Sequence, residues 1–183
     1  YHYLTQHWVI AEIVRRLDGR AIDVYLRDEI TDPLGMRDTY LGLPADQEQR
    51  LAKLHATDAS DPKGIGHLHG LRDSEFHRLV IPGASGAATA RDMARFYAAI
   101  ASGGALDGAR ILQPETVARM LRAEVDGEID LTFDMPVRRG LGIELGGLDD
   151  VRRHWPGATS TEGTVWHGGF GFSVCWGDRD TGL

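Results

Sequence analysis

The runs Thr164-Val165-Trp166-His167-Gly168-Gly169 and Phe172 to Trp176 decide the fold of this chain. Both runs are short and rich in the aromatic and β-branched residues that are typical of strands. Gly140 to Leu145 is predicted to be a third strand, further upstream. Because hairpin-like connections separate these segments, we expect them to form an antiparallel sheet at the C-terminal end of the chain.

Outward from this sheet, the upstream sequence has the periodicity of helices. Apolar residues recur at i, i+3, i+4 and i+7 at Ile10, Ile13, Val14 and Leu17, which places them on one face of a helix. We expect Thr5 to cap this helix and Gly19 to end it. A second helix carries Ile22, Leu26 and Ile30 on one face until Pro33 and Gly35 break it.

Two further helices are predicted in the middle of the chain. Thr89 and Asp92 form a capping-box pattern, and the buried stripe behind them comprises Met93, Phe96, Tyr97 and Ile100. Gly103-Gly104 ends that helix. Pro114 begins the next helix, which ends near Glu124, and Leu112 is placed to pack on Val117. A short strand is expected over residues 39–43.

Helices that come first and strands that come last predict an α+β fold, with a helical region packed on an antiparallel sheet. We expect residues 1–136 to be the mostly helical part, with an irregular loop over 44–78. Residues 137–183 are expected to be the sheet part of the same catalytic domain. The connection after Glu124 is acidic and rich in glycine, and no strand is predicted there.

Composition restricts the possible functions. The net charge of −7, without a block of Lys or Arg, argues against nucleic acid as a partner, because that affinity depends on neutralising phosphates. No run approaches the roughly 18 apolar residues of a membrane span. Cys175 is the only cysteine, so an internal disulfide is impossible. Small-molecule or protein partners are therefore expected; oligomeric state and compartment stay open.

The ends of the sequence suggest an internal piece of a longer protein. The chain opens on Tyr1, and the first helical periodicity follows within a few residues. At the other end, Leu183 follows a predicted turn over residues 177–182 and is expected to be the first residue of a returning strand. We therefore expect a fragment that is incomplete at both ends.

An ordered series of motifs resembles the class C beta-lactamase-like serine hydrolases, and within them the esterase branch. The series spans nearly the whole chain and comprises Tyr1 to Thr5, Val14 to Arg20, Leu26 to Ile30, Pro33 to Thr39, Pro82 to Gly86, Thr89 to Asp92, Leu112 to Val117 and His167 to Gly169. The resemblance implies a beta-lactamase/transpeptidase-like fold and no cofactor. The substrate it implies is a small ester or amide.

In this family a Ser-x-x-Lys pair supplies nucleophile and base, and a tyrosine assists proton transfer. The resemblance gives Tyr1 the tyrosine position, with the serine and lysine upstream of it. A nearby cationic lysine would favour the ionised phenol, which could then take the serine proton and return it to the leaving group. Where the family often has Asn or Ser, this chain has Tyr3, a departure that weakens the lactamase assignment.

The resemblance also gives His167 the place of the Lys that heads the family's glycine-rich strand. There His167 could donate to the substrate or to the tyrosine oxygen. Gly168 and Gly169 lack side chains, so a substrate can lie flat against the backbone. The backbone N–H of Phe170 would be one oxyanion donor. His-Gly-Gly in place of Lys-Thr-Gly is more similar to the esterase branch than to lactamases or transpeptidases.

Three other motifs suggest different chemistry. Ser60-Asp61-Pro62-Lys63 matches Ser-x-x-Lys, but it follows the tyrosine, and Gly64 and Gly66 disfavour a helix there. Ser85, in Gly83-Ala84-Ser85-Gly86, is similar to a nucleophile elbow, but Ala87 stands where glycine is needed. We expect it in a tight turn that enters the next helix.

His67, His69 and His77 could bind a metal, although no nearby Asp completes the usual hydrolase set, and exposed loop histidines are the simpler interpretation. We expect no metal site.

Our hypothesis is a fragment of a carboxylesterase-like serine hydrolase that acts on small esters through an acyl-enzyme and is inactive alone. Its catalytic residues are Tyr1 and His167, beside Gly168, Gly169 and Phe170. The alternatives are beta-lactamase or D,D-peptidase activity on amides of the β-lactam or peptidoglycan type, a binding module that kept the fold, and a metal-dependent hydrolase.

Overall fold

The computed structural model describes residues 4–53, 74–147, 156, 160–169 and 173–182. The chain divides into two compact units. The sheet unit comprises Glu29–Arg37 and Ala90–Leu183, and the helical unit comprises His2–Asp28 and Asp38–Thr89. Each is described separately below. The division into residues 1–136 and 137–183 stays a prediction.

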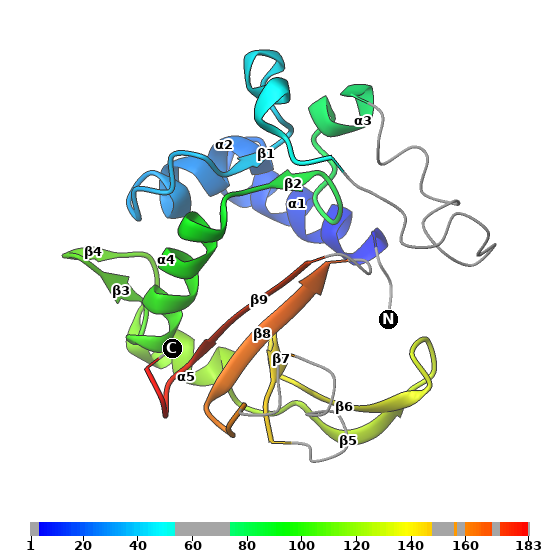
Figure 1. Cartoon of the computed structure of the whole chain (residues 1–183), viewed down its shortest axis with the longest axis vertical. Coiled ribbons are helices and arrows are strands. Elements are labelled where there is room, and N and C mark those ends of the chain that lie inside the picture. The colour runs from blue at the N-terminus through cyan, green and yellow to red at the C-terminus, as the bar shows by residue number, and fades with distance from the viewer. Residues whose placement is uncertain (1–3, 54–73, 148–155, 157–159, 170–172, 183) are drawn as a thin grey trace. The chain divides into compact units, whose positions relative to one another are not determined.

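The sheet unit is built on a five-stranded antiparallel sheet (Figure 1). Its strands lie side by side in the order in which they follow along the chain: β5 (Val125–Asp130), β6 (Met135–Arg139), β7 (Glu144–Leu145), β8 (Thr164–Gly169) and β9 (Ser173–Asp178). All neighbouring pairs are antiparallel. The prediction of helices with an antiparallel sheet is confirmed.

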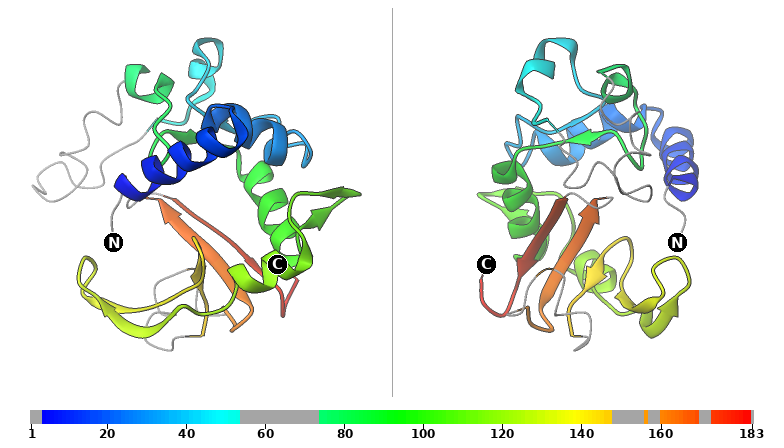
Figure 2. Two further views of the ribbon diagram at one scale, coloured as in Figure 1. Left: turned by 180° about the vertical axis from the view of Figure 1, so that it is seen from behind. Right: turned by 45° about the vertical axis from the view of Figure 1, so that its right-hand side comes forward.

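Two helices pack on this sheet, α4 (Ala90–Ala101) and α5 (Pro114–Met120). The main core joins both helices to the strands through the buried residues Tyr97, Ile100, Val117, Ile143, Leu145 and Val165. The predicted stripe of α4 is confirmed, since Met93 and Phe96 pack against the same cluster. Figure 2 shows α4 along β9 from two further directions.

Glycines allow the close approach of α4 to the sheet and end the helix. A Cβ at Gly177 of β9 would lie 3.1 Å from the Cβ of Tyr97, so a side chain there would press against the helix. Gly103 and Gly104 have φ values of 70° and 89°, which L-residues rarely adopt. The N–H of Gly104 donates to the carbonyl of Ala99, which ends α4 where the sequence predicted.

Arg95 of α4 fixes a smaller core in the same unit. Its Nε donates to the carbonyl of Leu34, and its Nη2 pairs with Asp107 at 2.7 Å. Asp107 lies in the turn between β3 (Ala105–Leu106) and β4 (Ala109–Arg110). Leu34 is completely buried with Met36 and Ala99. Arg95 therefore links α4 both to the segment around Leu34 and to the β3–β4 hairpin.

The sequence analysis missed the β5–β6 hairpin and placed the end of α5 too late. The helix ends at Met120 instead of near Glu124, and the acidic segment after it forms β5. The register of β5 shifts between Asp126 and Ile129, around Gly127, whose φ is 92°. This irregularity and the exposure of most of β5 remove the alternation that would have predicted a strand.

The helical unit begins with α1 (Thr5–Asp18). Gly19 ends it in the left-handed conformation, and its N–H donates to the carbonyl of Arg15. The predicted cap is wrong, because Leu4 occupies the N-cap and no side chain caps the helix; Thr5 is the first helical residue. Only Ala11 of α1 is buried. Its exposed large apolar residues are Trp8, Val9, Ile10, Ile13 and Leu17.

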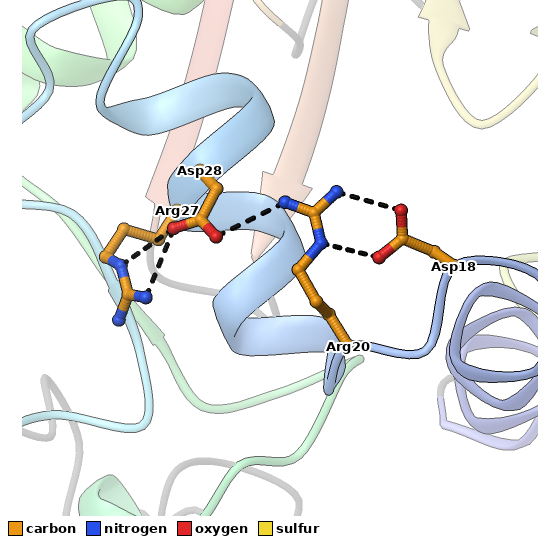
Figure 3. A network of polar contacts seen from close by, with 4 residues as sticks. All are labelled: Asp18, Arg20, Arg27 and Asp28. Carbon is orange, nitrogen blue, oxygen red and sulfur yellow. Dashed lines mark hydrogen bonds and ion pairs between the residues drawn. The ribbon is translucent and has the colours of Figure 1, made fainter.

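The second predicted helix starts as α2 (Ile22–Leu26) and continues as the π-helix η1 (Arg27–Thr31). A chain of ion pairs joins the end of α1 to this helix (Figure 3). Arg20 binds both oxygens of Asp18 and reaches Asp28 at 3.2 Å, and Arg27 contacts Asp28 as well. The guanidinium of Arg20 also lies 5.0 Å from the ring centre of Tyr25. These contacts fix the α1–α2 corner.

The rest of the helical unit has little regular structure. β1 (Tyr40–Leu41) lies within the strand predicted over 39–43 and pairs with β2 (Gly86–Ala87). The predicted irregular loop 44–78 contains the 3-10 helix η2 (Ala45–Arg50) and the short helix α3 (Ser74–Arg78). Gly42 permits a close turn here, since a Cβ would lie 3.0 Å from Val80.

Candidate active site

The strand predicted to carry the chemistry is β8, and its second half is the candidate site. His167, Gly168 and Gly169 pair with Cys175, Val174 and Ser173 of β9. β7 pairs only with Val165 and Trp166 of β8. Residues 167–169 of β8 therefore form no residue pairs with the described part of β7.

His167 is exposed, and its ring is oriented by the backbone. Nδ1 lies 2.8 Å from the carbonyl oxygen of Gly168. A carbonyl oxygen only accepts, so Nδ1–H is the donor. In a neutral ring the other nitrogen, Nε2, then keeps its lone pair. The neutral imidazole can accept a proton at Nε2, and only the imidazolium can donate from that atom.

The His167 side chain lies on the face of the sheet that packs against α4. Alternate residues of a strand share a face, and Val165, two residues earlier, is 1% exposed in the core with Tyr97. Cys175, the register partner of His167, packs against the same core. We refer to this side as the α4 face.

Two other titratable groups lie beneath His167. Burial raises the pKa of the Cys175 thiol, so the thiol stays protonated at neutral pH and is a poor nucleophile. Burial also raises the pKa of the Tyr97 phenol, with a smaller opposing effect from the backbone N–H of His167. Both groups are therefore neutral.

Gly169 lies opposite the Ser173 side chain of β9. A Cβ at this position would lie 2.4 Å from Oγ of Ser173, and its other near contacts would be 3.8 Å away. A side chain at Gly169 would therefore require the Ser173 hydroxyl to rotate.

The other predicted site residues lie outside the described residues. Tyr1 and Phe170 belong to this group, as do Tyr3 and the Ser60–Lys63 motif. The roles of Tyr1 and Phe170, and the convergence of the phenol and the imidazole in one site, stay predictions.

Ser85 has a structural role. It is buried, and its Oγ accepts from the N–H of Ile81 at 2.9 Å. Its backbone N–H donates to the carbonyl of Ile81. The hydroxyl is thus used inside the turn before α4, as expected for a tight turn, and is not presented to a substrate.

The metal hypothesis rests on His67, His69 and His77. Of the three histidines, only His77 lies within the described ranges; it is on α3, where its ring contacts Phe76 edge to face. Within those ranges no group of three or more His, Cys, Asp or Glu side chains could hold a metal ion. His67 and His69 lie outside them.

The sequence analysis missed a polar network at the base of the β8–β9 hairpin. Asp178 of β9 is 3% exposed and is the register partner of Thr164, which is 0% exposed. The Thr164 hydroxyl donates to this carboxylate, as does that of Thr161 at 2.8 Å. No local pattern indicates such a network, because its members are 14 to 17 residues apart.

None of the helices within the described residues is both long enough and apolar enough to span a bilayer.

The antiparallel sheet with helices packed on it, and a strand that carries His167, Gly168 and Gly169, agree with the fold that the resemblance to beta-lactamase-like serine hydrolases implies. The comparison with family models agrees with this class. The model described as Beta-lactamase matches residues 1–183, and the chain belongs to this family.

Similar proteins include esterases. "Esterase/beta-lactamase LipL" of Mycobacterium tuberculosis is 30% identical over 207 residues, which cover 100% of this chain and 46% of LipL. A novel penicillin-binding protein homolog from Caulobacter crescentus is 28% identical, with a TM-score of 0.79 over 98% of this chain and 49% of that one. A family VIII carboxylesterase is 26% identical, with a TM-score of 0.80 and the same coverage. The chain thus spans about half the length of these relatives.

Proposed function

We propose that this chain is part of a carboxylesterase-like serine hydrolase that acts on small esters through an acyl-enzyme. The observation that carries the proposal is the exposed histidine in the second half of β8, followed by Gly168 and Gly169. The similarity of the whole chain to LipL and to a family VIII carboxylesterase supports it.

In the proposed reaction, a serine hydroxyl of the parent protein attacks the ester carbonyl, and its proton passes to the phenolate of Tyr1. The C–O bond to the alcohol breaks, and the alcohol leaves with that proton. Water then attacks the acyl-enzyme, releases the acid and restores the serine. The backbone N–H of Phe170 stabilises the oxyanion; the loss of one such donor typically costs about 3 to 4 kcal/mol.

The ring geometry refines the role of His167. With Nδ1–H bound to the carbonyl of Gly168, the neutral ring presents Nε2 as an acceptor, so it can take the proton of the Tyr1 phenol and favour the phenolate. The imidazolium that forms can donate to the phenolate or to the substrate. This proposal adds a proton-accepting role to the expected donation from His167 to the substrate or to the tyrosine oxygen.

We further propose that the chain alone is inactive, because its nucleophile lies in another part of the parent protein. The test is a stopped-flow assay with 4-nitrophenyl acetate. With the purified chain, nitrophenol should be released without a burst and at the same rate as in buffer alone. A stoichiometric burst that disappears in Ser60→Ala would show that this chain carries its own nucleophile.

The roles of Tyr1 and His167 are tested in the full-length parent. Tyr1→Phe and His167→Gln should each lower kcat by about 100-fold or more, as expected when a proton-transfer group is lost. His77→Gln is the matched control, since it removes an imidazole outside β8, and it should retain activity. Undiminished turnover in Tyr1→Phe would exclude the tyrosine role.

Beta-lactamase or D,D-peptidase activity is the second candidate, supported by the similarity to the penicillin-binding protein homolog. Turnover of nitrocefin faster than of nitrophenyl esters by the parent would favour it. A binding module that kept the fold is distinguished by the parent sequence, which would then lack a Ser-x-x-Lys pair before Tyr1.

A further inference from the structure

The base of the β8–β9 hairpin contains a buried carboxylate that the proposed reaction does not use. Asp178 ends β9, opposite Thr164 at the start of β8. None of the ion pairs among the described residues includes Asp178. A buried charge of this kind is costly unless hydrogen bonds satisfy it.

Five donors surround the carboxylate, and two of them are shared: the Thr161 hydroxyl also lies 2.7 Å from Oδ2 of Asp180, and the Thr161 N–H lies 2.8 Å from Oγ1 of Thr164. Oδ2 accepts from the hydroxyls of Thr164 and Thr161 and from the N–H of Thr161 at 3.1 Å. Oδ1 accepts from the N–H groups of Asp180 and Thr181 at 2.9 and 3.0 Å. Burial alone would raise the pKa of Asp178, but the hydrogen bonds from Thr164, Thr181 and Thr161 outweigh it and hold the pKa well below its usual range. The group is therefore a carboxylate at neutral pH.

The other end of the hairpin has few side chains to specify its register. Gly168 and Gly169 supply two of the six residue pairs between β8 and β9, and glycine-rich strands specify register weakly. A slip by one residue exchanges the two faces of a strand. Such a slip would move His167 from the α4 face to the opposite face.

We propose that Asp178 is a positioning residue whose hydrogen bonds to Thr164 and Thr161 set the β8–β9 register and thereby hold His167 on the α4 face. The three residues from Thr164 to His167 span about 10 Å of strand, so the effect passes along the backbone without direct contact. The importance of Asp178 for catalysis rests on the proposed role of His167. The effect of Asp178 on the position of His167 is independent of that role.

The test compares Asp178→Asn with Asp130→Asn in the chain itself. Asp130 is a matched control because it is also buried and also accepts hydrogen bonds at one end of a hairpin of the same sheet, but in β5. Amide hydrogen exchange and cross-strand NOEs between residues 167 and 175 are measured by NMR. The His167 ring signals are identified by their loss in His167→Gln.

In Asp178→Asn, we expect the amides of β8 and β9 to exchange about 10- to 100-fold faster, as for the loss of hydrogen bonds to a charged group. The 167–175 NOEs should weaken and the His167 ring signals should shift. Asp130→Asn should leave these signals unchanged. Unchanged His167 signals in Asp178→Asn, or equal shifts in both variants, would overturn the proposal.

If Asp178→Asn does not fold, Thr164→Val and Thr164→Ser decide the question. Valine keeps the shape of threonine but removes the hydroxyl, which donates to Asp178 and accepts from the N–H of Thr161 at 2.8 Å, whereas serine keeps the hydroxyl. The proposal requires the His167 signals to shift in Thr164→Val and to stay near those of the unchanged chain in Thr164→Ser. The reverse order, or no difference between the two, contradicts it.

An activity measurement on the parent separates this inference from the proposed function. Thr164→Val should lower kcat for nitrophenyl acetate by about 10-fold or more, and Thr164→Ser should restore most of it. A parent without esterase activity would refute the proposed function, while the NMR result would still stand or fall on its own.

Discussion

Asp130 and Asp178 are both buried carboxylates, but their surroundings stabilise them differently. Burial raises the pKa of Asp130, and hydrogen bonds from the Arg139 guanidinium and from the N–H groups of Thr132 and Phe133 outweigh it, so that its pKa falls to about 2. Arg139 also pairs with Glu144 at 2.6 Å. Asp130 thus relies on an ion pair, whereas Asp178 relies on neutral donors.

Because the pKa of each carboxyl is lowered in the folded chain, the stability of the chain depends on pH in the acid range. A carboxyl whose pKa is lowered on folding stabilises the fold fully above its unfolded pKa, here near 3.8. This contribution disappears as the pH falls through the folded value. We therefore expect the Tm of the chain to fall steeply between about pH 4 and pH 2, as measured by circular dichroism.

Asp130→Asn should cost about 1.5 to 3 kcal/mol at neutral pH, because it removes a charged hydrogen bond to Arg139. Its Tm should depend less on pH in the acid range, since one of the titrating groups is gone. An acid transition as steep as that of the unchanged chain would contradict this assignment. Asp134→Asn, in the adjoining exposed turn, is the control.

At the same scale, the strand that contains His167, Gly168 and Gly169 was predicted from the sequence, because these residues lie in a β-prone run. Their role in a site stays a prediction. The role of Asp178 could not be predicted from the sequence, because Thr161 and Thr164 come within hydrogen-bond distance of its carboxylate only once the β8–β9 hairpin has formed. The convergence of His167 with Tyr1 is a prediction of the resemblance alone.

Among the elements, those with a strong periodic signal were predicted best. The buried stripe of α4 and its glycine end follow from spacing alone. β5 was missed because only Asp130 of its six residues is buried, so no alternation of apolar residues marks it. The change from α2 to the π-helix η1 was also missed, because π-helical spacing has no distinct signature in a short helix.

The packing of α4 on β9 gives a prediction for one position. Gly177→Val should destabilise the chain by about 1 to 3 kcal/mol through overpacking, because even its Cβ would lie 3.1 Å from the Cβ and 3.3 Å from the carbonyl oxygen of Tyr97. Urea unfolding followed by tryptophan fluorescence measures the change.

Gly86→Ala in β2 is the matched control, because a Cβ there meets nothing within 4 Å. It should leave the unfolding midpoint nearly unchanged. A Gly177→Val protein as stable as Gly86→Ala would mean that α4 does not press on β9 at this point.

On the scale of the whole molecule, the two units differ in how much they bury. Both hydrophobic clusters among the described residues belong to the sheet unit. In the helical unit, α1 buries only Ala11, and no residue of α2 is buried. Local stability follows buried apolar contacts, so the two units should not be equally stable.

Native-state hydrogen exchange tests this difference. Amides of α4 and β8 should exchange at least about 10-fold more slowly than those of α1 and α2. Equal protection throughout the chain would indicate a single cooperative unit instead. The measurement requires no assumption about catalysis.

The exposed apolar residues of α1 are expected to affect dye binding and the solubility of the chain. Val9, Ile10, Ile13 and Leu17 leave half or more of their surface uncovered, and Leu17 is 85% exposed. An exposed apolar patch of this kind binds environment-sensitive dyes and promotes association between copies of the chain. We expect anilinonaphthalene sulfonate to brighten in the presence of the native chain. Ile13→Lys should dim that fluorescence and delay the onset of turbidity on concentration.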